Sequence, residues 1–122
     1  MIAILADEPE KNRLLNGLLD DPDPIGLAMS CWETVSGLRR SHGTGIDEAR
    51  RRVEHMLATV AIRIVPIHRG EMTLALDAYQ QLGKGRHPAA LNMGDCFAYA
   101  CAKTNDAGLL YKGDDFSHTD LA

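Results

Sequence analysis

Apolar residues recur at helical spacing in five stretches of the chain, each bounded by residues that typically start or stop a helix. The first stretch is Lys11–Leu19, and the acidic, proline-rich run Asp20–Pro24 ends it. The other predicted helices are Ser30–Ser41, a segment with its N-cap at Asp47, Gly70–Gly83 and Asn92–Lys103. Their predicted buried faces comprise Trp32, Val35 and Leu38; Ile46, Val53, Met56, Leu57 and Val60; and Met72, Ala75, Leu76, Tyr79 and Leu82.

Short apolar runs between these helices predict strands. The runs are Ile25–Met29, the β-branched Ile62–Ile67, and Leu109–Tyr111. Strands that alternate with helices pair in parallel, so the pattern predicts an α/β fold around a mostly parallel sheet. The length of 122 residues suits one domain, which we expect to span the whole chain, residues 1–122.

Composition narrows the possible functions. The net charge of −4 excludes a basic protein that wraps nucleic acid with its whole surface. It leaves a nuclease possible, because a bound metal can supply positive charge locally. The three cysteines form no CxxC pair, which disfavours a disulfide framework or a zinc site and favours a reducing cytoplasm. No apolar run approaches the ~20 residues that cross a bilayer, so we expect no membrane partner.

Carboxylates beside predicted element boundaries are the main candidates for chemistry. Glu33 and Asp95 stand near helix starts, while Asp114 and Asp115 follow the last predicted strand. Ser30-x-x-Glu33 and Asn92-x-x-Asp95 also match the capping box, so each acid has a purely structural explanation. The sharper hypothesis is that the acids converge on a hard divalent cation, which relieves their mutual repulsion and serves phosphodiester chemistry.

Other reactive side chains carry weaker signals. The five histidines lack metal-ligand spacing, which favours scattered surface positions. Arg39–Arg40 and Arg50–Arg52 are typical of solvated helix faces, with a smaller chance of contacting a partner. The cysteines fall on helices among apolar neighbours, where inert buried thiols are usual: Cys31, Cys96 and Cys101.

At four segments the chain resembles a PIN-domain ribonuclease, specifically a VapC-type toxin. The longest segments are Gly83–Lys103 and Leu109–Asp120, and the others are Ser30–Gly37 and Ile4–Glu10. They occur in the family's order and cover essentially the whole chain. The resemblance implies a three-layer α/β/α fold and cleavage of RNA that depends on Mg²⁺ or Mn²⁺. It also implies the toxin role in a type II toxin–antitoxin system.

The resemblance also assigns roles to residues. It places the acidic site on Glu33, Asp95 and the Asp114–Asp115 turn, with Asp115 favoured as a metal ligand over Asp114. Arg86, with Lys84, would bind the RNA substrate or face the antitoxin. The implied partners are RNA, a cognate VapB-like antitoxin that blocks the site, and a second copy of the chain in a homodimer.

One departure from the family affects the expected activity. The family opens with a strand ending in an Asp-Thr-Ser-like triplet, whereas Met1–Leu5 matches the helix that follows it. We therefore expect the first strand and first catalytic aspartate to be absent here and to be encoded upstream of Met1. The alternatives are a truncated, catalytically impaired PIN-like module that binds antitoxin or RNA, and a plain α/β ligand-binding domain whose acids are caps.

Overall fold

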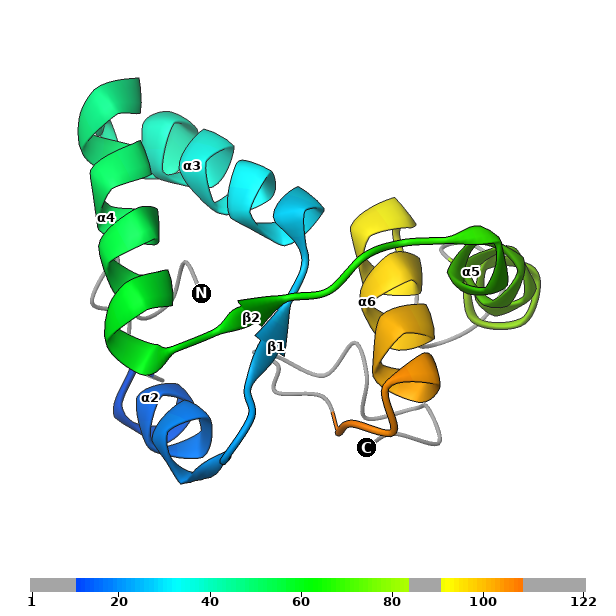
Figure 1. Cartoon of the computed structure of the whole chain (residues 1–122). Helices are drawn as coiled ribbons and strands as arrows, with labels where there is room; N and C mark the ends of the chain where they lie inside the picture. The colour runs from blue at the N-terminus through cyan, green and yellow to red at the C-terminus, as the bar shows by residue number, and fades with distance from the viewer. Residues whose placement is uncertain (1–10, 84–90, 109–122) are drawn as a thin grey trace. The chain divides into compact units, whose positions relative to one another are not determined.

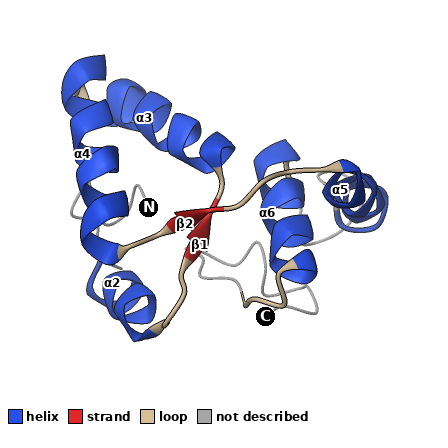
Figure 2. Ribbon diagram, viewed as in Figure 1, coloured by secondary structure: helices blue, strands red, loops and turns tan. Residues whose placement is uncertain are grey.

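The computed structural model describes residues 11–83 and 91–108, which contain five helices and two short strands (Figures 1 and 2). The chain divides between Val65 and Pro66 into two compact units. Each predicted helix within the described residues is confirmed, with bounds that differ by at most two residues. The predicted N-cap Asp47 is wrong, because Gly45 is the N-cap and the helix begins at Ile46. The predicted strand Leu109–Tyr111 lies outside the described residues.

The first unit joins three helices and a parallel pair of strands. Its elements in chain order are α2 Lys11–Asp20, β1 Ile25–Gly26, α3 Ala28–His42, α4 Ile46–Val60 and β2 Arg63–Ile64. The strands pair in parallel, Ile25 with Arg63 and Gly26 with Ile64. This pair confirms the predicted α/β class, although both strands are shorter than predicted.

The parallel pairing of β1 with β2 is short because neither strand can continue. Arg63 N–H donates to the Pro24 carbonyl at 2.9 Å, and Val65 N–H donates to the Gly26 carbonyl at 3.0 Å. The next residue, Pro66, has no N–H to extend the ladder. On the other strand the chain turns into α3 directly after Leu27.

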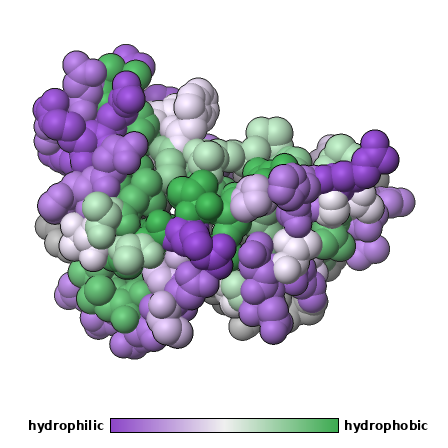
Figure 3. All heavy atoms as spheres, viewed as in Figure 1, coloured by the Kyte–Doolittle hydropathy of each residue, from purple (hydrophilic) through white to green (hydrophobic). Residues whose placement is uncertain are grey.

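Small and aliphatic side chains pack the helices of this unit. The buried residues of α3 are Thr34, Gly37 and Leu38, and those of α4 are Ala49, Val53 and Met56. Met56 also packs with Leu14 of α2. The outer side of α4 is charged, as the hydrophilic colouring over this helix shows (Figure 3).

Two residues predicted to be buried in this unit are exposed, so that prediction is wrong. Trp32 is 72% exposed and Ile46 is 51% exposed. The buried stripe of α3 runs through Thr34, Gly37 and Leu38, and Trp32 lies roughly 160° around the helix from Thr34. Ile46 is the first residue of α4, one turn before the buried stripe begins at Ala49.

The second unit is built on α5 Arg69–Leu82 and α6 Met93–Thr104. Its core contains Ala75 and Ala78 of α5 together with Leu91, Cys96 and Ala100. Small residues allow close approach of the two helices, so the face of α5 is set by its alanines rather than by its largest side chains. The predicted burial of three α5 residues is therefore wrong, because these are exposed: Met72, Leu76 and Tyr79.

Candidate active site

Asp95 is held in the first turn of α6 by two reciprocal hydrogen bonds with Asn92. The Asn92 Oδ1 accepts a bond of 2.9 Å from the Asp95 backbone N–H, and the Asn92 backbone N–H donates to Asp95 Oδ2 at 3.1 Å. The capping box predicted for this pattern is thus confirmed. It fixes the direction of a half-buried carboxylate and occupies one of about four acceptor positions that a carboxylate offers.

Glu33 lies in the second turn of α3 and makes no capping bond. The helix begins at Ala28 after the N-cap Leu27, whose carbonyl already accepts the Cys31 N–H at 3.2 Å. Ser30 is consequently inside the first turn, and the predicted Ser30–Glu33 capping box is wrong. The cause is Leu27, which is extended and 4% exposed, so its burial next to β1 places the helix start. Glu33 is exposed, and no described residue is seen to bond its carboxylate.

The structure leaves the convergence of the predicted acids untested. Glu33 belongs to the first unit and Asp95 to the second. Among residues 11–83 and 91–108, no group of three or more acids, histidines or cysteines could hold a metal ion. The remaining predicted site residues lie outside the described residues: Lys84, Arg86, Asp114 and Asp115.

The donor chemistry around Asp95 fits a hard cation. Its neighbour Cys96 is buried, and burial, followed by the charge of Asp95, raises the pKa of the Cys96 thiol. The Cys96 side chain packs in the apolar core of this unit with Leu91 and Ala100, which favours a structural role for its thiol. Carboxylate oxygens at Asp95 and at exposed Glu33 are the ligands that Mg²⁺ and Mn²⁺ prefer.

The described histidines and cysteines match their predicted structural roles. His42, His55 and His68 are exposed, and His68 takes part in a capping box with Glu71 at the start of α5. All three cysteines are free, with Cys101 buried like Cys96 and Cys31 half-buried. Burial raises the pKa of the Cys31 and Cys101 thiols as well, which disfavours the reactive thiolate form.

Neither acid lies in the depression on α4. This depression has a volume of about 790 Å³ and is lined by charged residues of that helix: Asp47, Glu48, Arg50, Arg51, Arg52, Glu54 and His55. Glu48 pairs there with Arg51 at 2.7 Å and with Arg52 at 3.1 Å. The depression is thus a charged surface of α4 that includes these two ion pairs, and neither Glu33 nor Asp95 is among its lining residues.

Next to Glu33 in the sequence, Trp32 exposes its indole to solvent. Trp32 was expected in the core, yet it is the most exposed large hydrophobic residue of the described chain. Counting around the helix from Thr34, Gly37 and Leu38 places Trp32 on the opposite side, because these three residues define the packed side. Separately, none of the described helices is long and apolar enough to span a membrane.

Comparison with known proteins identifies the family. The PIN domain matches residues 1–121. Ribonuclease VapC30 of Mycobacterium tuberculosis is 36% identical over 122 residues, which cover 100% of this chain and 91% of the relative. Ribonuclease VapC of Mycolicibacterium smegmatis is 36% identical, with 100% and 92% covered. Ribonuclease VapC42 of Mycobacterium tuberculosis is 39% identical, with 99% and 91% covered. The chain therefore belongs to the PIN-domain family and, within it, to the VapC ribonucleases.

Proposed function

We propose that this chain is the toxin of a type II toxin–antitoxin pair and that it cleaves RNA phosphodiester bonds with the help of a divalent cation. The observation that carries the proposal is the match to the PIN domain over residues 1–121, together with ribonuclease relatives aligned over the whole chain. A full-length match at this identity is a stronger basis than fold alone, since one fold hosts many functions.

In this proposal Glu33 and Asp95 hold the cation, which is Mg²⁺ or Mn²⁺. The absence of a cap at Glu33 supports a functional role, because the exposed carboxylate has no structural task in the described part of the chain. The cap at Asp95 is compatible with ligation, since it orients the carboxylate at the positive end of α6. Asp115 contributes directly or through water, with Asp114 as the second choice of the pair.

The side chains have separate tasks in the reaction. When bound, the cation offsets the charge of the phosphate and lowers the pKa of a water molecule. Asp95 brings a carboxylate whose direction is fixed before the substrate arrives, because Asn92 holds it. Such preorganisation removes the cost of ordering the ligand during the reaction. Glu33 brings a solvent-accessible carboxylate that can meet a hydrated cation.

The proposed partners follow from the same family. Arg86 and Lys84 bind the RNA backbone or face a VapB-like antitoxin. The antitoxin blocks the site, and an arginine placed among the acids would suit that task. We further propose that residues 1–122 form one PIN-like domain, that it acts in the cytoplasm, and that two copies form a homodimer.

The test is cleavage of mixed RNA by the purified protein, expressed with any in-frame coding sequence upstream of Met1, with Mg²⁺, with Mn²⁺ and with a chelator. The proposal predicts cleavage with a divalent cation, none with the chelator, and a loss of orders of magnitude in Asp95→Asn. Asparagine can still accept the Asn92 N–H bond, so the cap is nearly preserved and the melting temperature should hold.

Asp77→Asn provides a matched control for this experiment. Asp77 is an exposed aspartate on α5 of the same unit, and its substitution removes the same charge. It should leave cleavage unchanged. Equal cleavage by Asp95→Asn and Asp77→Asn would contradict the proposed role of Asp95, whereas RNA binding without any cleavage would favour a binding module.

A further inference from the structure

The outer face of α3 combines an exposed indole with two exposed guanidinium groups. Trp32 is 72% exposed, and Arg39 and Arg40 are exposed further along the helix. The buried side of α3 lies opposite, through Thr34 and Leu38. A large aromatic side chain left in water is informative, because indole burial is strongly favourable and exposed apolar surface commonly marks an interaction site.

The helix arranges this face in two parallel rows. Trp32 and Arg39 are seven residues apart, which places them within about 20° of each other around the axis. Glu33 and Arg40 form the second row by the same spacing. Each arginine stands about 10 Å along the axis from the first member of its row. Trp32 and the two arginines therefore flank the carboxylate that we propose as a metal ligand.

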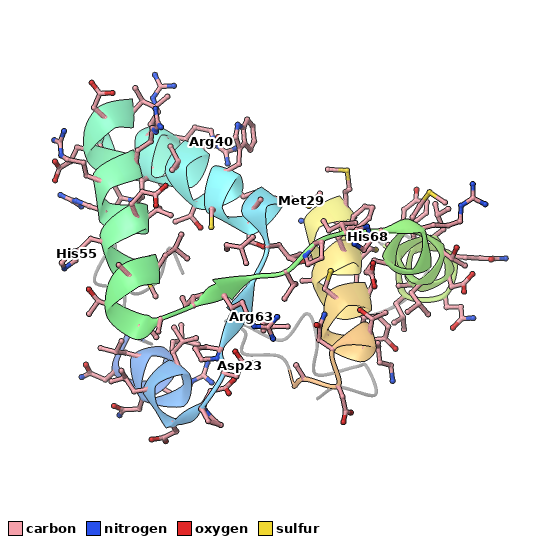
Figure 4. All side chains as sticks on the ribbon, viewed as in Figure 1. Asp23, Met29, Arg40, His55, Arg63 and His68 are labelled. Atoms are coloured by element: carbon pink, nitrogen blue, oxygen red, sulfur yellow. The ribbon has the colours of Figure 1, made fainter. Side chains whose placement is uncertain are left out.

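The two arginines lack acidic partners in the part of the chain that the structure describes. Arg40 Nε donates only to the Ser36 carbonyl oxygen, at 3.4 Å, and its side chain projects from α3 (Figure 4). Elsewhere, by contrast, Arg51 and Arg52 pair with Glu48, and Arg63 pairs with Asp23. Within residues 11–83 and 91–108, no acid thus neutralises the positive charge of Arg39 and Arg40.

We propose that this face of α3, formed by Trp32, Arg39 and Arg40, binds single-stranded RNA next to the reaction site, with a base stacked on the indole and backbone phosphates on the guanidinium groups. The inference rests on the proposed ribonuclease function. Unpaired bases stack on aromatic side chains, and arginine binds phosphate with a fork of N–H donors.

The overall charge of the chain strengthens this assignment. A net charge of −4 repels RNA at long range, so binding requires a local cationic surface. The indole and guanidinium groups together match a nucleotide, which offers both a flat apolar base and an anionic phosphate. A surface for a protein partner would need the indole but would not require two unpaired arginines beside it.

The experiment uses the indole itself, because Trp32 is the sole tryptophan of the chain. A mixed-sequence single-stranded RNA dodecamer is titrated into the purified full chain in EDTA, and tryptophan fluorescence is recorded. Stacking predicts quenching that saturates. Unchanged fluorescence at RNA concentrations that saturate binding, measured by anisotropy of labelled RNA, would overturn the proposal.

Variants measured by anisotropy separate stacking from charge. Trp32→Ala should weaken binding about 5- to 150-fold, the range for losing one base–aromatic stack, and Trp32→Phe should restore most of it. The double variant Arg39→Gln/Arg40→Gln should reduce the slope of log K against log salt by about 1.4. Arg50→Gln, an exposed arginine of α4, is the control and should leave the quenching and the affinity nearly unchanged.

Two results would overturn the inference without touching the proposed function. One is Asp95-dependent cleavage with the same KM in wild type and Trp32→Ala. The other is unchanged RNA affinity in Trp32→Ala together with lost self-association or lost antitoxin binding, which would assign the face to a protein partner. Conversely, quenching by RNA without cleavage under any metal would uphold this face and contradict the proposed function.

Discussion

Glu33 and Asp95 show two ways in which a helix can present an acid. Asp95 is half-buried and locked by two hydrogen bonds to Asn92 in the first turn of α6. Glu33 is exposed in the second turn of α3, whose N-cap Leu27 contributes no side-chain bond. Both acids lie three residues after a polar residue that favours N-caps, yet only one pair forms the box.

The difference separates structural from chemical roles. At Asp95 the same carboxylate serves the fold and, in our proposal, the cation, so a substitution there spares stability only if, like Asp95→Asn, it keeps an acceptor for the Asn92 N–H. The Glu33 carboxylate makes no capping bond and no ion pair with the described residues. Substitutions at the two positions therefore distinguish a ligand from a cap.

Glu33→Gln should reduce metal-dependent RNA cleavage by roughly 10²-fold or more, because removing one charged ligand costs several kcal/mol of charge stabilisation. The free energy of unfolding should change by less than about 0.5 kcal/mol, since the residue is on the surface. Cleavage kinetics and thermal melts measure both. Glu54→Gln, an exposed acid of α4, is the matched control. Comparable cleavage by the two variants would remove Glu33 from the proposed site.

Asn92→Ala should lower both the melting temperature and the rate of RNA cleavage. It removes the acceptor of the Asp95 N–H bond, which should cost about 1 kcal/mol and lower the melting temperature by roughly 3–5 °C. Loss of a group that orients a metal ligand typically costs 10- to 100-fold in activity. Asn92→Ser keeps a strong cap and should restore both. A stability loss with full activity would show that the cap does not position Asp95.

Acidification should weaken the pairing of β1 with β2. Arg63 donates to both oxygens of Asp23, at 2.7 and 3.1 Å, and these bonds lower the pKa of the Asp23 carboxyl below 3.8. A depressed pKa stabilises the fold above pH 3.8 and loses this contribution as the pH falls through the folded value. Asp23→Asn should reduce the dependence of stability on pH in the acid range. Thermal melts between pH 2 and 6 measure this dependence. An unaltered curve would exclude the pair as a contributor.

Ser30→Ala should have the smallest effect. Ser30 is inside the first turn of α3, where alanine is the better helix former and no cap is lost. The melting temperature should stay the same or rise slightly. A fall comparable to that of Asn92→Ala would mean that Ser30 caps the helix after all and would erase the contrast between the two helices.

The sequence predicted what depends on periodicity and local chemistry. The helices were found because apolar spacing and stop signals agree, and the Asn92–Asp95 cap was found because both partners are local. The start of α3 was missed because it depends on the burial of Leu27 beside β1, which no local pattern reveals. The exposure of Trp32 and Leu76 was missed because hydrophobicity alone does not show that glycine and alanine form the packed sides.

The candidate acids came from two different sources. The acids at predicted element boundaries are Glu33, Asp95, Asp114 and Asp115. Acids at such positions also commonly serve as helix caps or turn residues. Only the family resemblance joined them in one site, because carboxylates from distant segments meet through tertiary structure. Whether Glu33 and Asp95 share a cation accordingly stays a prediction.

The most direct test of that prediction is Mn²⁺ binding to the purified chain, measured by calorimetry. The account predicts one ion per chain, with binding weakened at least 10-fold in Glu33→Gln and in Asp95→Asn. Because both acids hold the same ion, the loss in binding free energy of the double variant should not exceed the sum of the losses in the two single variants. Saturation should never exceed one ion per chain. Wild-type affinity in both single variants would contradict the account, as would two independent sites that each variant removes separately.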